Sequence, residues 1–214
     1  NPNYKGFDDW QLALRRENQR RKEIDRLSFK AQYLRGLCEL AHIEDCIELW
    51  QHLAENKTCL TEYLGLTREE HETFLRQGRD ALGALLEPQR RKQRFVLYQL
   101  ELDEQKAIPF AFKELAALQK AGYEQPPAAM YRMAGSGEVY CPVEQSDAEI
   151  LKRLFADCRE ELPEGCHGRP MALSDVVELD HSPRRVYYYV NGEREFPQVK
   201  FSPMLAKKDI KEGT

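Results

Sequence analysis

The pattern of apolar residues changes character near the middle of the chain. Up to residue 93 the apolar positions recur at spacings of three and four, the period of an amphipathic helix. From residue 94 onward, runs rich in β-branched and aromatic residues alternate with turn residues. We therefore expect an α+β protein, with an N-terminal all-α helical bundle in residues 1–93 followed by a small mixed or antiparallel sheet domain with two helices in residues 94–214.

Local signals mark helix ends in the first half. Gly65 follows an apolar run and suits the left-handed position that ends many helices. Thr67 and Glu70 have the spacing of a capping box, which predicts that a helix begins there. Trp50 lies on the preceding apolar stripe, so we expect it to anchor the core of this half.

The second half combines strand-like runs with two helical segments. Strands are predicted at residues 95–100, 129–133, 138–143, 172–179, 185–191 and 196–201. Helices are predicted at residues 109–122 and after the capping residue Ser146. The glycine-rich residues 134–137 are expected to form the turn of a hairpin, and the segment from Ser202 is expected to be a frayed polar tail.

Residues 94–202 carry a family resemblance. The stretches that carry it are Leu173-Ser174-Asp175-Val176-Val177, Tyr187-Tyr188-Tyr189-Val190 and Val199-Lys200-Phe201. They resemble the YodL-like family of small domains, whose members typically carry Gly-His-Ser where this chain has Gly165-Cys166-His167-Gly168. This chain also lacks the acidic residue expected near Asn191. The resemblance implies a setting in mobile elements of Gram-positive bacteria and no defined reaction.

Charge is nearly balanced over the whole chain but not along it. The 32 Lys and Arg residues against 36 Asp and Glu residues give a net charge of −4, which does not indicate a nucleic-acid-binding protein. Residues 15–35, however, contain eight basic and only three acidic residues. We predict that a basic helical arm here contacts an acidic partner or a nucleic-acid backbone through Arg15, Arg16, Arg20, Arg21, Lys22 and Arg26.

Three small constellations invite a chemical interpretation, and none is complete. Ser174, Asp175 and His181 lack the surroundings of a hydrolase nucleophile, and Ser-Asp more simply satisfies backbone groups at a strand entry. Cys38, His42 and Cys46 are spaced for one helix face but lack a fourth zinc ligand. Cys166-His167 are adjacent, which rarely lets a base point at a thiol. We assign no catalytic residue, metal or cofactor.

The remaining features favour an interaction protein. The six cysteines show no disulfide framework, and no apolar run reaches the roughly 18 residues of a membrane helix. We expect a cytoplasmic, non-enzymatic accessory or regulatory protein of a bacterial mobile genetic element that binds a protein partner, with Tyr188 as a surface contact. The alternatives are a nucleic-acid-binding or anti-defence protein acting through the basic helix, and a hydrolase using Ser174 or Cys166. No membrane association is expected, and the sequence identifies no small-molecule substrate.

Overall fold

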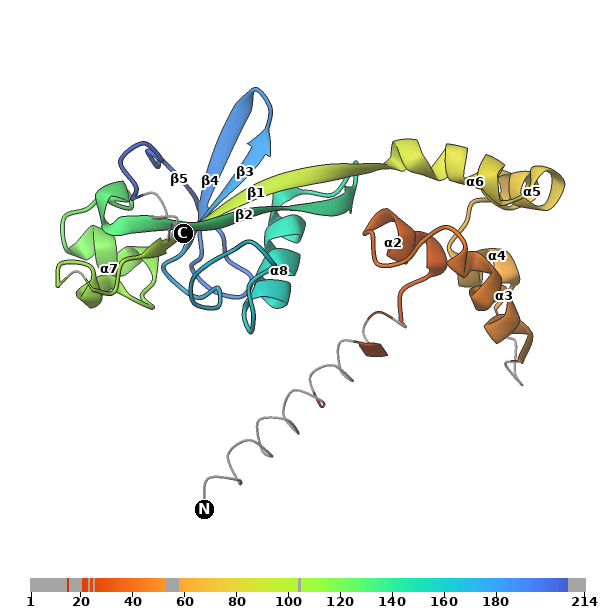
Figure 1. Cartoon of the computed structure of the whole chain (residues 1–214), viewed down its shortest axis with the longest axis horizontal. Coiled ribbons are helices and arrows are strands. Elements are labelled where there is room, and N and C mark those ends of the chain that lie inside the picture. The colour runs from red at the N-terminus through yellow and green to blue at the C-terminus, as the bar shows by residue number, and fades with distance from the viewer. Residues whose placement is uncertain are drawn as a thin grey trace, which may run out of the picture. The chain divides into compact units, whose positions relative to one another are not determined.

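The computed structural model describes residues 15, 21, 22, 24, 26–52, 58–103 and 105–207 (Figure 1). These residues combine α-helices with a five-stranded sheet, so the chain is an α+β protein. The chain separates into two compact units. The first unit is Asn1–Arg91 with Tyr140–Val143, and the second is Lys92–Val139 with Glu144–Thr214.

Short helices make up most of the described part of the first unit. They are α2 (Phe29–Leu34), α3 (His42–His52), α4 (Leu60–Leu64), α5 (Arg68–Gln77) and α6 (Arg79–Leu86), followed by a 3₁₀ turn at Glu87–Gln89. Their buried apolar side chains form one cluster, composed of Phe29, Tyr33, Leu34, Ile43, Cys46, Leu64, Leu66, Leu82 and Leu86. Trp50 is only half-buried, so the prediction that it anchors this core was wrong. Its indole N–H donates a hydrogen bond to the Thr58 carbonyl at 3.1 Å.

The predicted helix ends in this unit are confirmed. Gly65 ends α4 with φ 71°, and Thr67 and Glu70 form the capping box of α5. The Glu70 carboxylate is buried and also accepts hydrogen bonds from Lys30 and Gln89, each at 2.7 Å. Burial alone would raise the pKa of Glu70, but the bonds from Gln89 and Lys30 hold it below its ordinary value.

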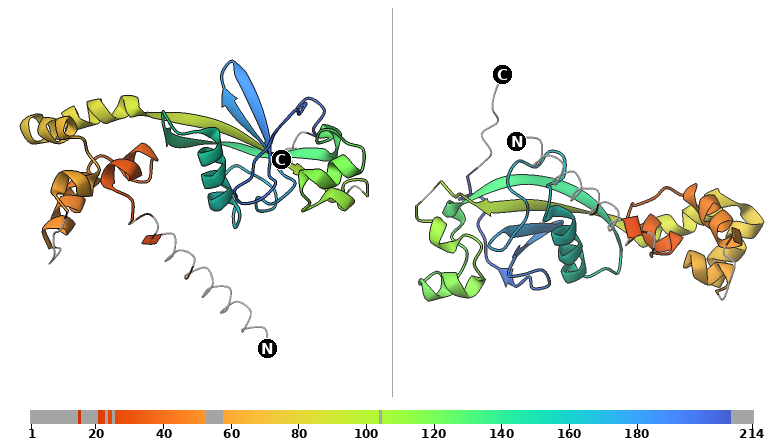
Figure 2. Two further views of the ribbon diagram at one scale, coloured as in Figure 1. Left: turned by 180° about the vertical axis from the view of Figure 1, so that it is seen from behind. Right: turned by 90° about the horizontal axis from the view of Figure 1, so that it is seen from below.

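The strands of the sheet lie in the order β2-β1-β3-β4-β5 (Figures 1 and 2). They are β1 (Arg90–Leu100), β2 (Tyr131–Pro142), β3 (Val176–His181), β4 (Arg184–Tyr189) and β5 (Gln198–Val199). The pairs β1–β3, β3–β4 and β4–β5 are antiparallel, which agrees with the predicted sheet. The three closing strands are shorter than predicted, and β1 begins at Arg90, before the boundary that we predicted after residue 93.

The predicted hairpin turn at residues 134–137 was wrong, because β2 passes through it without a break. Gly137 instead makes room for an aromatic ring, since a Cβ atom there would lie 2.9 Å from the ring of Phe95. Gly135 has φ 150° and a Cβ there would lie 2.6 Å from the Cα atom of Cys166. These glycines therefore allow close packing along a strand rather than a change of chain direction.

Side chains of the sheet alternate between two covered faces. On one face, Val96, Tyr98, Val176 and Tyr189 belong to an apolar cluster that also contains Leu118 of α7 (Leu115–Lys120). On the other face lies α8 (Asp147–Cys158), whose axis runs across the direction of the long strands β1 and β2 in both views of Figure 2. It begins with the predicted Ser146 cap. Burial on both faces explains the run of six buried residues at the end of β1.

Two further predictions differ from the structure. The helix predicted at residues 109–122 is confined to α7, because Phe112 has a positive φ of 60° and interrupts the helical backbone. The described part of the tail is not frayed, because Ala206 is buried in the apolar cluster and Lys207 pairs in parallel with Arg132 of β2. The rest of the predicted tail, from residue 208, lies outside the described residues.

Candidate functional site

Two strained residues of the second unit are linked directly. Among the described residues, Phe112 (φ 60°) and Ser174 (φ 76°) are the non-glycine residues with positive φ. The Phe112 amide donates a hydrogen bond to Ser174 Oγ at 3.1 Å, and the Tyr131 hydroxyl donates to the Ser174 carbonyl at 3.0 Å. Ser174 is completely buried. Such backbone outliers cost about 1–3 kcal/mol each and cluster at functional sites, so this pair marks a candidate site.

The next residue, Asp175, forms a buried ion pair. Its carboxylate is completely buried and accepts hydrogen bonds from both terminal nitrogens of the Arg169 guanidinium. The side-chain amide of Gln99 and the backbone amide of Ala172 also donate to it, each at 3.0 Å. Burial raises the pKa of Asp175 to about 6, and the favourable contacts with Arg169, Ala172 and Gln99 oppose that rise only in part.

Gln99 of β1 fixes the loop that carries Arg169. Its amide nitrogen donates to the Arg169 carbonyl at 2.8 Å, and its amide oxygen accepts from the Arg169 backbone N–H at 3.1 Å. The guanidinium carbon of Arg169 lies 4.8 Å from the centroid of the Phe112 ring. Arg169 thus joins the strained Phe112 to the buried Asp175, while 52% of Phe112 stays exposed.

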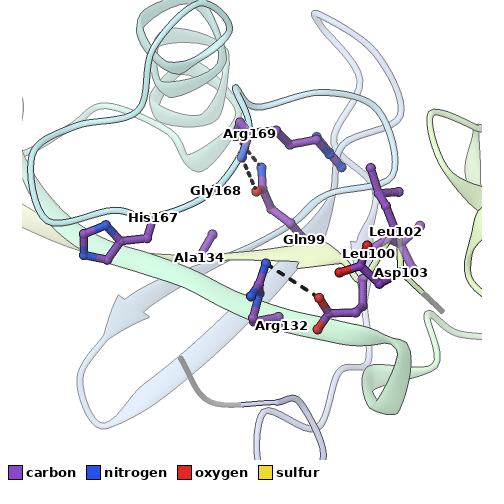
Figure 3. Close-up of a pocket in the computed structure, with 10 residues that line it drawn as sticks. Gln99, Leu100, Leu102, Asp103, Arg132, Ala134, His167, Gly168 and Arg169 are labelled. Atoms are coloured by element: carbon purple, nitrogen blue, oxygen red, sulfur yellow. Dashed lines mark hydrogen bonds and ion pairs between the residues drawn. The ribbon is translucent and has the colours of Figure 1, made fainter. Parts of the chain in front are cut away.

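A pocket of about 190 Å³ lies beside this loop (Figure 3). Its side chains come from three places, the end of β1, the start of β2 and the loop 167–169. Its charged and titratable lining residues are Glu101, Asp103, Arg132, His167 and Arg169. Arg132 Nη2 lies 3.6 Å from a carboxylate oxygen of Glu101, and a dashed line leads from Arg132 in Figure 3. The pocket therefore offers both charge signs within a small volume.

A family model for the YodL-like domain matches residues 94–201. The chain belongs to the YodL-like family. The match spans the strained pair, the buried ion pair and all ten residues that line the pocket. No curated protein and no solved structure matches the chain. The candidate site therefore lies within the YodL-like part of the chain. The family match does not assign a chemical reaction to it.

The structure separates the residues of the hydrolase alternative. Ser174 Oγ accepts from the amide of Phe112, whereas His181 Nε2 lies 2.9 Å from a carboxylate oxygen of Asp147 at the start of α8. Asp175 is held by Arg169 and does not contact His181. The interpretation that Ser-Asp satisfies backbone groups fits these contacts, because Ser174 binds one backbone amide and Asp175 binds another.

The two cysteine constellations show no activated thiol. Among the residues that the structure describes, no group of three or more His, Cys, Asp or Glu side chains could hold a metal ion, and this includes Cys38, His42 and Cys46. Burial raises the pKa of Cys38 to about 11. Burial also raises the pKa of Cys166, whose sulfur lies 3.8 Å from the Ser136 carbonyl oxygen. Both thiols therefore stay protonated at neutral pH.

Tyr188, the predicted surface contact, is half-buried. Its hydroxyl donates a hydrogen bond to Asp147 Oδ2 at 2.6 Å, the same oxygen that faces His181. Burial and this bond raise the pKa of Tyr188 well above its ordinary value. The side chain thus helps to hold the start of α8 to the sheet, which leaves only part of the ring open to a partner.

The basic arm is described only in part. Arg15, Arg21 and Lys22 are helical and exposed, and Arg26 is exposed in a turn. Arg16 and Arg20 lie outside the described residues. Among the described part of the chain, no helix is long and apolar enough to cross a membrane.

Sequence reasoning did not identify several residues of the site. Gln99, Phe112, Arg132 and Arg169 lie in separate segments, and no local motif connects them. The one signal in the sequence was Asp175, an acidic residue just before an apolar strand. If Asp175 is buried there, its carboxylate requires a hydrogen-bonding or charged partner. That partner proved to be Arg169, six residues earlier in the chain.

Proposed function

We propose that this YodL-like protein is a non-enzymatic accessory or regulatory interaction protein of a bacterial mobile genetic element. Its YodL-like part binds a protein partner through the surface formed by Phe112, Arg169 and Leu102. The observation that carries the proposal is the exposed Phe112 ring, held on a strained backbone and backed by Arg169. The setting in a mobile element rests on the family resemblance, and the setting in the cytoplasm rests on the sequence, whose six cysteines show no regular disulfide framework.

The chemistry of this surface supports protein binding. Aromatic and arginine side chains dominate the binding energy of protein interfaces, especially where neighbouring residues exclude water. Leu102, which lines the pocket beside Arg169, is 40% exposed and adds an apolar contact. A phenylalanine that is 52% exposed and has a strained left-handed backbone contributes less to folding than a buried one would.

The support beneath this surface is rigid. Arg169 is fixed through its backbone by Gln99 and through its guanidinium by Asp175. Ser174 fixes the Phe112 backbone from below. A contact surface whose side chains are already ordered loses less conformational entropy on binding.

We propose that the helices of the first unit form the predicted bundle and contact a macromolecular partner of their own.

A comparison of matched variants tests the proposal. Nuclease-treated host lysate is passed over immobilised full-length wild type, Phe112→Ala and Met204→Ala, and the captured proteins are quantified by mass spectrometry. Met204 is 91% exposed and lies outside the proposed surface, so its variant controls for the general loss of an apolar side chain. We expect Phe112→Ala to reduce capture of the specific partner about tenfold or more. Equal capture by all three proteins would contradict the proposal.

The nucleic-acid alternative keeps one specific observation in its favour. Each described residue of the basic arm that we predicted as a contact, Arg15, Arg21, Lys22 and Arg26, is exposed. Exposed cations suit the phosphate backbone, whose binding depends steeply on salt. The same nuclease treatment separates the two functions, because a nucleic-acid-dependent capture disappears with it.

A further inference from the structure

The carboxylate of Glu101 is poorly satisfied for its degree of burial. Its side chain is only 11% exposed. Its partners among the described residues are Arg132 Nη2 at 3.6 Å and Lys207 Nζ at 3.9 Å. Both distances exceed the 2.7–3.2 Å of a good hydrogen bond. A nearly buried carboxylate without close donors is costly, so a ligand with N–H groups would be bound favourably here.

The guanidinium of Arg132, beside Glu101, lacks close hydrogen-bond acceptors in the part of the chain that the structure describes. Arg132 projects from β2 into the same pocket, and its side chain is 48% exposed. A guanidinium carries five N–H donors, and the long pair with Glu101 engages at most one of them closely. His167 also lines the pocket and lies to the left of Arg132 in Figure 3. A carboxylate in the pocket would therefore find donors next to the Glu101 acceptor.

Because acidic and basic residues both line the pocket, an ion of a single charge would be a poor ligand. An anion in the pocket would face Glu101 and Asp103, and a cation would face Arg132 and Arg169. A molecule that carries both charges on neighbouring atoms avoids each repulsion and satisfies both groups. The 3.6 Å between Arg132 Nη2 and Glu101 Oε1 shows that the two complementary charges are also neighbours in the protein.

The size and the walls of the pocket narrow the class of ligand further. Its volume of about 190 Å³ is below the roughly 300–1,000 Å³ of sites for larger ligands and suits a molecule of amino-acid size. Leu102 and Ala134 provide apolar wall, and both lie beside the charged groups. An aliphatic side chain could pack there without burying further polar atoms.

We propose that this pocket binds a free aliphatic α-amino acid in its zwitterionic form. The ammonium group binds Glu101, the carboxylate binds Arg132, and the side chain packs against Leu102. The proposal rests on the pocket alone and does not depend on the protein-binding surface proposed above. It gives the YodL-like part a small-molecule site as well as a macromolecular one.

The first test uses the unmodified full-length protein. Binding of L-alanine, L-valine and L-leucine is measured by NMR titration and compared with N-acetyl-L-leucine, which lacks the ammonium group, and L-leucinamide, which lacks the carboxylate. We expect saturable binding of at least one free amino acid and about tenfold weaker binding of both blocked forms of leucine. The proposal is overturned if none of the three binds saturably up to about 10 mM, or if the blocked forms bind equally well.

The second test locates the site. Glu101→Gln and Arg132→Gln are each expected to weaken amino-acid binding about tenfold or more. The matched control is the surface pair Arg159 and Glu193, 3.7 Å apart, where Arg159→Gln and Glu193→Gln should change nothing. Unchanged binding in both pocket variants would show that the amino acid binds elsewhere, and it would overturn the assignment of the ligand to this pocket. If a pocket variant does not fold, the wild-type titrations with free amino acids and with the two blocked forms of leucine still test whether the protein binds a zwitterion.

Discussion

The Phe112 amide and the Ser174 hydroxyl oxygen meet at 3.1 Å, although 62 positions separate the two residues in the sequence. Both have left-handed backbones, and neither is a glycine. The hydrogen bond therefore couples two strained positions, so that relaxation of one backbone would remove a contact that stabilises the other. This coupling fixes where the exposed Phe112 ring points, and it leads directly to the first prediction.

Substitution of Phe112 should affect stability according to backbone freedom rather than side-chain size. Phe112→Gly is expected to change the free energy of unfolding by less than about 1 kcal/mol, because relief of strain offsets loss of the Arg169 contact. Phe112→Val should lower it by about 1–2 kcal/mol, because a β-branched residue tolerates positive φ poorly. Chemical denaturation of both variants measures the difference. A larger loss for glycine than for valine would contradict the assigned strain.

The raised pKa of Asp175 predicts a characteristic pH dependence. Because the folded state holds this carboxyl with a pKa of about 6, above its unfolded value of 3.8, folding favours the protonated form. The contribution of Asp175 to stability should be largest below about pH 4 and should fall as the pH rises through about 6. From the size of the shift, the fall amounts to at most about 3 kcal/mol.

The variant Asp175→Asn isolates this effect. It removes the titrating group, so the gap in unfolding free energy between wild type and variant should narrow between about pH 4 and pH 7. Relative to wild type, the variant should gain up to about 3 kcal/mol of stability between these pH values, because folding disfavours the Asp175 anion and Asn cannot ionise. Denaturant titrations of both proteins at several pH values measure this change. A gap that widens with rising pH would show that the ion pair lowers the pKa instead.

The path of β2 past Phe95 predicts an unusual sensitivity at one glycine. Gly137→Ala should lower the free energy of unfolding by about 1–3 kcal/mol, because the added methyl group would lie 2.9 Å from the Phe95 ring. Gly192→Ala is the control, since nothing lies within 4 Å of a Cβ atom there. It should change stability by less than about 1 kcal/mol. Thermal denaturation compares the two variants, and equal effects would argue against the close packing of Gly137 on Phe95.

The nucleic-acid alternative predicts a steep dependence on salt. If the basic arm binds phosphates, affinity for duplex DNA should fall linearly on a double-logarithmic plot against salt, and Arg20→Glu with Arg21→Glu should abolish it. The control is Arg68→Glu with Arg76→Glu, which reverses two exposed charges on α5. Fluorescence anisotropy at several salt concentrations gives the slope. Binding that ignores both salt and the arm variant would exclude this function.

The sequence predicted those features that depend on local chemistry. The capping box at Thr67, the Ser146 cap and the left-handed Gly65 were foreseeable, because each uses residues within a few positions of one another. The antiparallel sheet followed from period-two patterning and the family resemblance. The second unit also has the two α-helices expected of it, α7 and α8.

The features that were missed depend on contacts between distant segments. Gly135 and Gly137 look like a turn in sequence, and only the positions of Phe95 and Cys166 show why a strand needs glycine there. The pocket joins residues of β1, β2 and a late loop, and no spacing in the sequence relates Glu101 to Arg132. Trp50 was misassigned because periodicity indicates which face is buried and not which residue is central.

The division into two units has a consequence for how this chain could be recombined. Tyr140–Val143 belong to the first unit, where the Tyr140 ring lies 4.6 Å from the guanidinium carbon of Arg90, yet they fall inside the family-matched segment 94–201. A crossover at residue 94 between two diverged relatives would therefore inherit Tyr140 from one parent and Arg90 from the other. If the YodL-like segment is exchanged as one piece between relatives, Tyr140–Val143 must remain compatible with the helices of the first unit.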